Sequence, residues 1–190
     1  MKTPSQVLHT LKQGNLTFCS VKKTPYQEND SNSFSKNIQE PIAVIIGCSD
    51  SRVSPEIIFN AALGELFVIR TAGNVITPTG MESIVFGSID LNAPLIVVMG
   101  HQNCGAIDAV LAKKITNIPQ TAAKIDEALK AYGHSIGTLD VKQAIIDNIL
   151  YSVNTVAKHP LIAKAQSAGQ IQVVGAYFNF ETCKIEFLKT

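Results

Sequence analysis

Two runs of consecutive apolar residues constrain the fold of this chain more than any other feature. They span residues 42–47 and 95–100 and contain only aliphatic side chains, methionine and glycine. A strand that is apolar at every position, rather than at every second one, is buried on both faces. Strands of this kind occur almost only in parallel sheets that carry helices on both sides. We therefore predict an α/β fold with a mostly parallel central sheet covered by helices.

The rest of the chain alternates between strand and helix patterns, as this fold class requires. We expect further strands at residues 65–70, 170–178 and 184–188, the last as an antiparallel edge strand. Apolar spacing and capping residues predict helices at 4–18, 79–91, 104–114, 121–131, 141–158 and 160–168, and a short one after Ser54. Capping boxes are predicted at Thr3–Gln6 and at Thr79–Glu82.

The length of 190 residues favours a single domain spanning residues 1–190. Within it, we expect residues 1–40 to form an N-terminal helix and a polar extension, long enough to wrap over a partner subunit or over the core. The net charge is +1 and no long charged run occurs, which favours neither nucleic acid nor a membrane surface as a partner. No apolar stretch approaches the ~20 residues of a transmembrane helix.

Each apolar run is followed by soft metal ligands. Cys48 comes directly after the first run, and His101 and Cys104 follow the second. The carboxyl ends of parallel strands face one crevice, so we expect these three side chains to meet. Three Cys and His ligands suit zinc and leave its fourth position open, as catalysis requires. We therefore predict one catalytic Zn²⁺ per subunit; a redox disulfide between Cys48 and Cys104 is the alternative.

Two charged residues follow the first cysteine closely. Asp50 and Arg52 lie on the same face of an extended segment. Beside zinc, Asp50 can accept a hydrogen bond from a metal-bound water, and Arg52 can keep that carboxylate ionised and oriented. Asp50 can instead ligate the metal and close the fourth position, so both arrangements stay open. Arg70 ends another predicted strand at the same edge.

Three blocks, at residues 48–53, 64–74 and 100–105, resemble in order those of the beta-class carbonic anhydrases. The resemblance extends from the Leu11, Gly14, Asn15 and Phe18 pattern to residues 173–176. It implies zinc on Cys48, His101 and Cys104, and reversible hydration of CO2 to bicarbonate and a proton. Zinc-bound hydroxide would attack CO2, assisted by the Asp50–Arg52 dyad. The resemblance also implies a homo-oligomer with the dimer as its smallest unit, in which residues 1–40 pack on a partner subunit.

The family has two types of site, and the sequence favours one of them. One type holds substrate with a glutamine nine residues before the first cysteine, which is Gln39 here. The other has a tryptophan three residues before that cysteine, where this chain has Ile45. We therefore expect an open site with water on zinc near neutral pH. The resemblance also assigns Gly105 to substrate binding, and Phe67, Ala72 and Phe86 to an apolar CO2 pocket.

Two other hypotheses about the function stay open. The same zinc centre could hydrolyse another small linear electrophile such as carbon disulfide, or the chain could be a non-catalytic zinc-binding regulatory module. Residues 175–183 depart from the family pattern, and this departure leaves the assignment of the metal ligands unaffected. Reduced thiolate ligands favour the cytoplasm, with a periplasmic mature form as the alternative.

Overall fold

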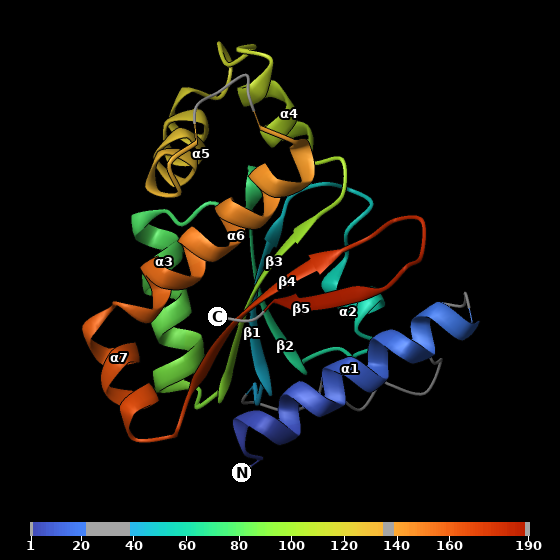
Figure 1. Ribbon diagram of the computed structural model, residues 1–190. Coiled ribbons are helices and arrows are strands. Elements are labelled where there is room, and N and C mark those ends of the chain that lie inside the picture. Colours follow the sequence, from blue (N-terminus) through green and yellow to red (C-terminus); the bar gives the residue numbers. More distant parts are fainter. Residues whose placement is uncertain (1, 22–38, 135–138, 189–190) are drawn as a thin grey trace.

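The computed structural model describes residues 2–21, 39–134 and 139–188 and shows a sheet covered by helices on both faces (Figure 1). The sheet has five strands in the order β2-β1-β3-β4-β5. Its strands are β1 (Ala43–Cys48), β2 (Leu66–Thr71), β3 (Leu95–His101), β4 (Gln172–Phe178) and β5 (Ile185–Leu188). All neighbouring pairs are parallel except β4 and β5. The predicted mostly parallel sheet with an antiparallel edge strand is confirmed.

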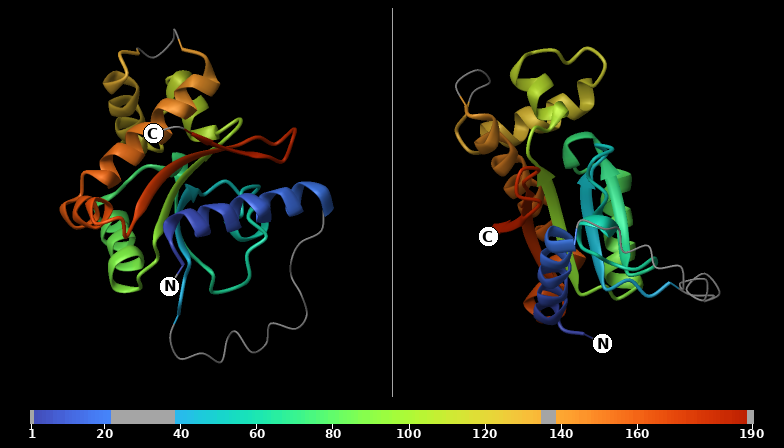
Figure 2. Two further views of the ribbon diagram at one scale, coloured as in Figure 1. Left: turned by 60° about the horizontal axis from the view of Figure 1, so that its bottom comes forward. Right: turned by 90° about the vertical axis from the view of Figure 1, so that its right-hand side faces the viewer.

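Two groups of helices cover the two faces of the sheet (Figures 1 and 2). The helices of one face are α3 (Pro78–Val85), α4 (Gly105–Leu111), α5 (Pro119–Ala131), α6 (Val141–Ala157) and α7 (Pro160–Ser167). The other face carries α1 (Pro4–Val21) and α2 (Pro55–Ile58). Two short turns complete the chain, the 3₁₀ turn η2 (Ala72–Asn74) and the π-helical turn η3 (Phe86–Asp90).

The continuous apolar strands divide their side chains between two cores. Along β1, Val44 and Ile46 pack with α3 to α7, whereas Ala43 and Ile45 pack with α1 and α2. Successive side chains of a strand point to opposite faces, so a strand between two helical layers needs an apolar residue at every position. All six residues of β1 and all seven of β3 are buried. This burial explains why the two apolar runs identify the centre of the sheet.

The start of α3 differs from the prediction. The helix begins at Pro78, and Thr77 is its N-cap, with the Thr77 hydroxyl accepting a hydrogen bond from the Gly80 N–H at 3.0 Å. The capping box predicted at Thr79–Glu82 is therefore wrong. Proline favours the first helical position because its missing N–H and fixed φ suit that site. The capping box at Thr3 and Gln6 is confirmed, with reciprocal bonds of 2.8 and 3.3 Å.

Gly14 and Asn15 hold helix α1 against other parts of the same chain. A Cβ on Gly14 would lie 1.8 Å from the Phe59 carbonyl oxygen, so only glycine permits this approach to the end of α2. Asn15 donates to the carbonyls of Ile58 and Cys183 at 3.2 and 3.1 Å. The predicted packing of this helix on a partner stays a prediction, and much of the predicted extension lies outside the described residues.

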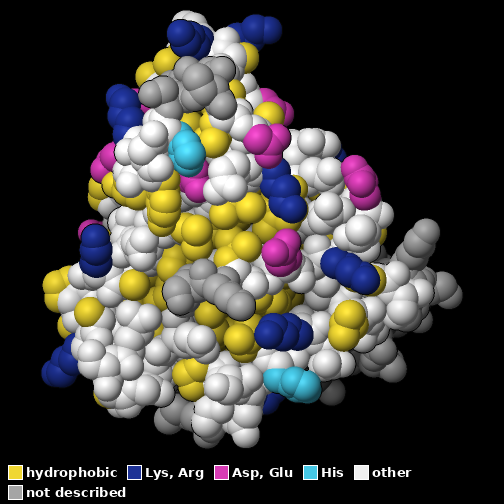
Figure 3. Space-filling model, in the orientation of Figure 1, with side chains coloured by type: hydrophobic (Ala, Val, Ile, Leu, Met, Phe, Trp, Pro, Cys, Tyr) yellow, Lys and Arg dark blue, Asp and Glu magenta, His cyan; other side chains and the backbone are white. Residues whose placement is uncertain are grey.

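One face of the molecule carries a broad apolar surface. Hydrophobic side chains gather between α6 and α1, where β4 and β5 come to the surface (Figure 3). Leu188 of the edge strand β5 is only partly buried and packs with the core of α3 to α7, whereas Ile185 and Phe187 pack on the side of α1 and α2. Among the described helices, none has the length and apolar character needed to cross a bilayer.

Candidate metal centre

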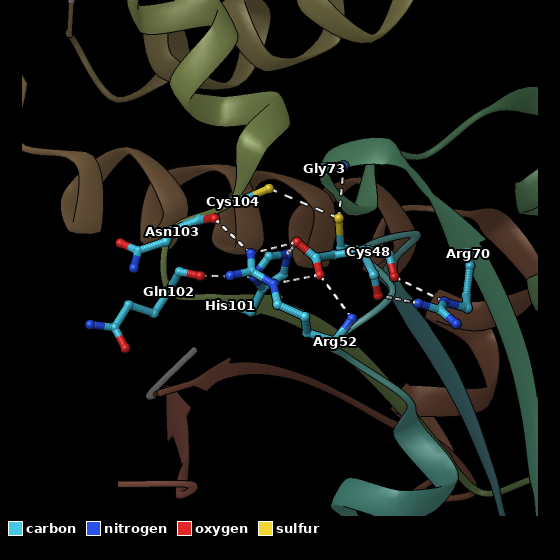
Figure 4. A network of polar contacts seen from close by, with 9 residues as sticks. Cys48, Arg52, Arg70, Gly73, His101, Gln102, Asn103 and Cys104 are labelled. Atoms are coloured by element: carbon cyan, nitrogen blue, oxygen red, sulfur yellow. Dashed lines mark hydrogen bonds and ion pairs between the residues drawn. The ribbon is translucent and has the colours of Figure 1, made fainter. Parts of the chain in front are cut away.

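The three predicted metal ligands meet at the carboxyl edge of the sheet (Figure 4). Cys48 is the last residue of β1, His101 is the last residue of β3, and Cys104 is the N-cap of α4. Their ligand atoms all lie within 4.8 Å of one another, and the two sulfurs are 3.9 Å apart. None of the three side chains is more than 5% exposed. The strand ends thus assemble the set from parts of the chain that are distant in sequence.

The histidine of this set presents an unused nitrogen to the two sulfurs. His101 Nδ1 lies 2.9 Å from the carbonyl oxygen of Gln102, which can only accept, so Nδ1 carries the proton. Nε2 is therefore a lone-pair donor, and it is buried without a hydrogen-bond partner among the described residues. A buried polar atom of this kind is costly unless something binds it. A neutral imidazole oriented through its other nitrogen is the usual arrangement of a zinc-binding histidine.

The two cysteines are placed to provide thiolates. The Cys104 thiol beside Cys48 holds the pKa of Cys48 well below its ordinary value, and the same contact raises the pKa of Cys104. The Gly73 N–H points at the Cys48 sulfur over 3.4 Å, from a backbone with φ of 66° that glycine adopts without strain. The close contact of the two sulfurs thus favours one thiolate in the pair. A divalent cation would favour ionisation of both thiols, which fits the donor set to zinc.

Asp50 and Arg52 form a bidentate ion pair beside the ligands. Arg52 donates to Asp50 Oδ1 from its main-chain N–H at 2.9 Å and from Nε at 3.0 Å, and to Oδ2 from Nη2 at 2.8 Å. These hydrogen bonds hold the pKa of Asp50 well below its usual range. Oδ2 also lies 3.9 Å from His101 Nε2. An ionised carboxylate therefore faces the metal-ligand cluster while Arg52 fixes its orientation.

Arg70 supports the turn that carries this pair. Its Nε donates to the Cys48 carbonyl at 2.9 Å and its Nη2 to the Asp50 carbonyl at 2.6 Å (Figure 4). Both bonds hold main-chain atoms, so Arg70 fixes the backbone between a metal ligand and the carboxylate. Its side chain reaches the turn from the neighbouring strand β2.

The predicted substrate-binding residues divide into two groups. Ala72 begins η2 beside the cysteine ligand Cys48, and Gly105 begins α4 directly after Cys104, so both lie at the metal edge. Phe67 and Phe86 contact each other, with ring centroids 6.1 Å apart. Phe67 is paired with Val44, four residues before the cysteine ligand at the end of β1. It therefore lies toward the amino end of the sheet, away from the ligands of its own chain.

Gln39 also lies away from the metal ligands of its own chain. It precedes β1, is exposed, and lines a surface hollow together with Pro94, the residue before β3. This hollow is at the amino edge of the sheet, whereas the ligands are at the carboxyl edge. The structure therefore does not bring Gln39, Phe67 or Phe86 to the zinc ligands within one chain, and their substrate role stays a prediction.

Sequence reasoning missed one residue of the site, Phe180. Its ring meets the His101 ring edge-on with centroids 5.4 Å apart, and the Arg52 guanidinium carbon lies 4.4 Å from its centroid. The turn after β4, where the sequence departs from the family pattern, therefore contacts one of the predicted metal ligands. The register of β3 and β4 pairs His101 with Phe178, so the chain that follows β4 folds over the ligand. No local sequence pattern carries this signal.

A buried Cys-His-Cys set at the carboxyl edge of a parallel sheet could hold a metal ion through three protein ligands, the class of site that leaves a position for chemistry. The family model for carbonic anhydrases matches residues 43–185, so the chain belongs to the carbonic anhydrase family, and its fold and structural neighbours place it in the beta class.

Two relatives illustrate the similarity in sequence. Carbonic anhydrase 2 of Mycobacterium tuberculosis is 46% identical over 110 residues, which are 57% of this chain and 53% of the relative. This chain thus spans about half the length of that relative. A carbonic anhydrase of Pseudomonas aeruginosa is 30% identical over 163 residues, which are 79% of this chain and 74% of the relative.

Two solved structures show the similarity in fold. The beta-carbonic anhydrase CcaA is 25% identical and has a TM-score of 0.73, with 96% of this chain and 95% of that chain covered. The Coccomyxa beta-carbonic anhydrase, solved in complex with acetazolamide, is 26% identical and has a TM-score of 0.74. That match covers 99% of this chain and 87% of the other.

Proposed function

We propose that this protein catalyses the reversible hydration of CO2 to bicarbonate and a proton at the centre formed by Cys48, His101 and Cys104. The observation that carries the proposal is the buried Nε2 of His101, which has no hydrogen-bond partner in the part of the chain that the structure describes. It faces two cysteine sulfurs and an ionised carboxylate. Family membership supports the same reaction. The Asp50–Arg52 pair supports a catalytic centre, because a purely structural zinc site usually has four protein ligands.

The cofactor that this set fits is one Zn²⁺ per subunit, held by the two cysteine sulfurs and by Nε2 of His101. When bound, zinc supplies a water of lowered pKa, so that a hydroxide nucleophile is available near neutral pH. The thiols must be reduced to receive the metal, which supports the cytoplasm as the compartment.

Asp50 and Arg52 have separate tasks in this proposal. Oδ1 of Asp50 accepts two hydrogen bonds from Arg52 and Oδ2 accepts one. A carboxylate oxygen has two lone-pair positions, so Oδ2 retains one toward the ligand cluster. There Asp50 accepts a hydrogen bond from the attacking water and orients its oxygen toward CO2. Arg52 keeps the acceptor ionised and prevents it from turning.

We also propose that the resting site is open, with its fourth position available to water. Three hydrogen bonds from Arg52 restrain Asp50 from becoming the fourth ligand. The presence of Gln39 and of Ile45 in place of a tryptophan supports the open type of site by resemblance. An Asp50 oxygen at roughly 2.0–2.2 Å from zinc in a crystal grown near neutral pH would contradict this proposal.

The active assembly in this proposal is a homo-oligomer with the dimer as its smallest unit. Gln39, Phe67 and Phe86 lie away from their own metal edge, so they can line a substrate pocket only beside the ligands of a second subunit. Phe86 is 46% exposed, which is unusual for a large apolar side chain and leaves it available for such a contact. The apolar face of Figure 3 offers further surface for association.

Stopped-flow measurement of CO2 hydration on protein of known zinc content tests the proposed function. We expect turnover in proportion to bound zinc, rising as the pH is increased. Zinc-loaded protein without activity at any pH up to the alkaline range would overturn the proposal. Hydrolysis of carbon disulfide without CO2 hydration would overturn it in favour of another small linear electrophile.

A further inference from the structure

We propose that Phe180 is a positioning residue of the metal centre, which holds Arg52 in the orientation that keeps Asp50 in place. The inference rests on the proposed function, because it assigns Phe180 to the Asp50–Arg52 pair. It concerns the turn after β4, a part of the chain for which the sequence predicted no role in the site.

Arg52 needs such support because its own side chain is poorly enclosed. The side chain is 55% exposed, and a long exposed side chain normally samples many rotamers. Here the guanidinium donates to Asp50 and to the Asn103 carbonyl at 3.3 Å, and its carbon lies 4.4 Å from the centroid of Phe180. An aromatic face at this distance attracts the cation and excludes water from one side of it. Phe180 thus covers one face of the guanidinium, a side that hydrogen bonds made in the plane of the group do not restrain.

The Phe180 ring is itself held in place by contacts that begin at the metal ligand. The Phe180 main-chain N–H donates to Gln102 Oε1 at 3.0 Å, and Gln102 Nε2 donates to Glu181 at 3.0 Å. Gln102 directly follows His101, and its own N–H donates to the Phe178 carbonyl at 2.9 Å. The ring also meets Phe178 edge-on, with centroids 5.4 Å apart. These contacts make Phe180 a fixed support rather than a mobile surface residue.

The single ring of Phe180 therefore contacts both the metal-ligand set and the Asp50–Arg52 pair. Its contact with His101 is on the metal-ligand side, and its contact with Arg52 is on the side of the carboxylate. If the aromatic face is removed, Arg52 gains freedom, and Asp50 is then less restrained where it faces His101 Nε2 over 3.9 Å. Turnover should fall because the acceptor spends less time in its working orientation, whereas the zinc ligands themselves are unchanged.

Phe180→Leu, Phe180→Tyr and Phe187→Leu test the inference in the zinc-loaded protein. Leucine keeps apolar bulk but has no aromatic face, and tyrosine keeps the face. Phe187 is the matched control, since its ring on β5 also lies under a cation, Lys12 Nζ at 5.3 Å, but outside the metal site. The readouts are kcat, KM, zinc content and the NMR signal of the Arg52 Nε–H group, assigned from an Arg52→Lys variant.

We expect the wild-type and Phe180→Tyr proteins to show an Arg52 Nε–H signal that is shifted upfield by the ring and exchanges slowly with water. In Phe180→Leu the upfield shift should disappear and exchange should quicken, while kcat falls about three- to tenfold at unchanged KM and zinc content. Phe187→Leu should leave all four readouts unchanged.

A Phe180→Leu protein that keeps the wild-type signal and kcat would overturn the inference, as would an equal loss in Phe187→Leu. The signal is independent of CO2 hydration, so the two proposals fail separately. Inactivity of zinc-loaded wild-type protein would overturn the proposed function. A wild-type Arg52 signal without the upfield shift would overturn the role of Phe180.

Discussion

Replacement of Asp50 by asparagine is the perturbation whose consequences the structure defines in most detail. The amide preserves the size and shape of the side chain but has only one oxygen acceptor. In the native pair, Oδ1 accepts from the Arg52 main-chain N–H and from Nε, and Oδ2 accepts from Nη2. Whichever way the amide turns, its NH2 group faces at least one Arg52 donor. Asp50→Asn therefore breaks at least one of three hydrogen bonds and removes the charge beside His101.

The structure predicts a large effect on turnover and a small one on stability. Arg52 is more than half exposed, so water replaces much of what the ion pair contributes to folding. The catalytic loss is larger, since misplacing a group that orients a reactant can cost about a hundredfold in rate. The zinc ligands are not altered, so one zinc per chain should remain. We thus expect kcat/KM to fall by about a hundredfold without loss of metal.

Stopped-flow kinetics, zinc analysis and urea unfolding on the same preparation measure these three quantities together. Asp126→Asn is the matched control, because it makes the same chemical change in a surface pair, where Asp126 lies 2.6 Å from Lys130. The control should keep wild-type kinetics. Wild-type kcat/KM in Asp50→Asn would refute the assigned role, and loss of zinc would show that Asp50 is a ligand rather than a hydrogen-bond acceptor.

Three further predictions concern the metal, the fold and the response to acid. Cys104→Ser should weaken zinc binding by at least an order of magnitude in competition with a chromophoric chelator, because a hydroxyl is a poorer zinc ligand than a thiolate. Gly14→Ala should lower the free energy of unfolding in urea by about 3 kcal/mol, since a Cβ placed 1.8 Å from the Phe59 carbonyl oxygen forces α1 away from its core. Arg52 depresses the pKa of Asp50, so their pair adds stability above about pH 4 that is lost as the pH falls toward the folded pKa. The difference in unfolding free energy between wild type and Asp50→Asn should therefore be smaller at pH 2 than at pH 6.

Each of these predictions has its own control. Cys19 is partly buried and lies outside the metal site, so Cys19→Ser should bind zinc like the wild type; equal weakening in both serine variants would count against Cys104 as a ligand. Gln13→Ala, next to Gly14 on an exposed position of α1, should change stability by less than about 0.5 kcal/mol. A Gly14→Ala protein as stable as wild type would mean that α1 does not pack as described. A difference between wild type and Asp50→Asn that grows toward acid would contradict the depressed pKa.

The two central strands, β1 and β3, could be predicted because every residue of a strand buried on both faces is apolar, and the sequence shows such runs directly. The run at 42–47 is offset by one residue from β1, and the run at 95–100 ends one residue before β3 does. Because parallel strands end at one edge, the meeting of Cys48, His101 and Cys104 followed from the same reasoning. That reasoning also shows where the substrate assignment was incomplete. Gln39 precedes β1, so it belongs at the opposite edge of the sheet.

Two other features escaped prediction, the first for a local reason and the second because it depends on tertiary contacts. The start of α3 was misplaced because Thr79 offered a capping box, while Pro78 already occupied the first helical position and left Thr77 as the cap. The role of Phe180 depends on the register between β3 and β4 and on the side chain of Gln102, which follows the histidine ligand. The strand register and the position of the Gln102 side chain both result from tertiary packing, which the residues next to Phe180 in the sequence do not reveal.

The central claim is that this chain interconverts CO2 and bicarbonate at the Cys48–His101–Cys104 centre. Loss of ¹⁸O from labelled CO2 to water at equilibrium, followed by mass spectrometry, measures that interconversion without a pH indicator. Protein with one zinc per chain should accelerate the loss in proportion to its concentration, and Cys104→Ser should not. Loss at the uncatalysed rate in the presence of fully zinc-loaded protein would contradict the claim.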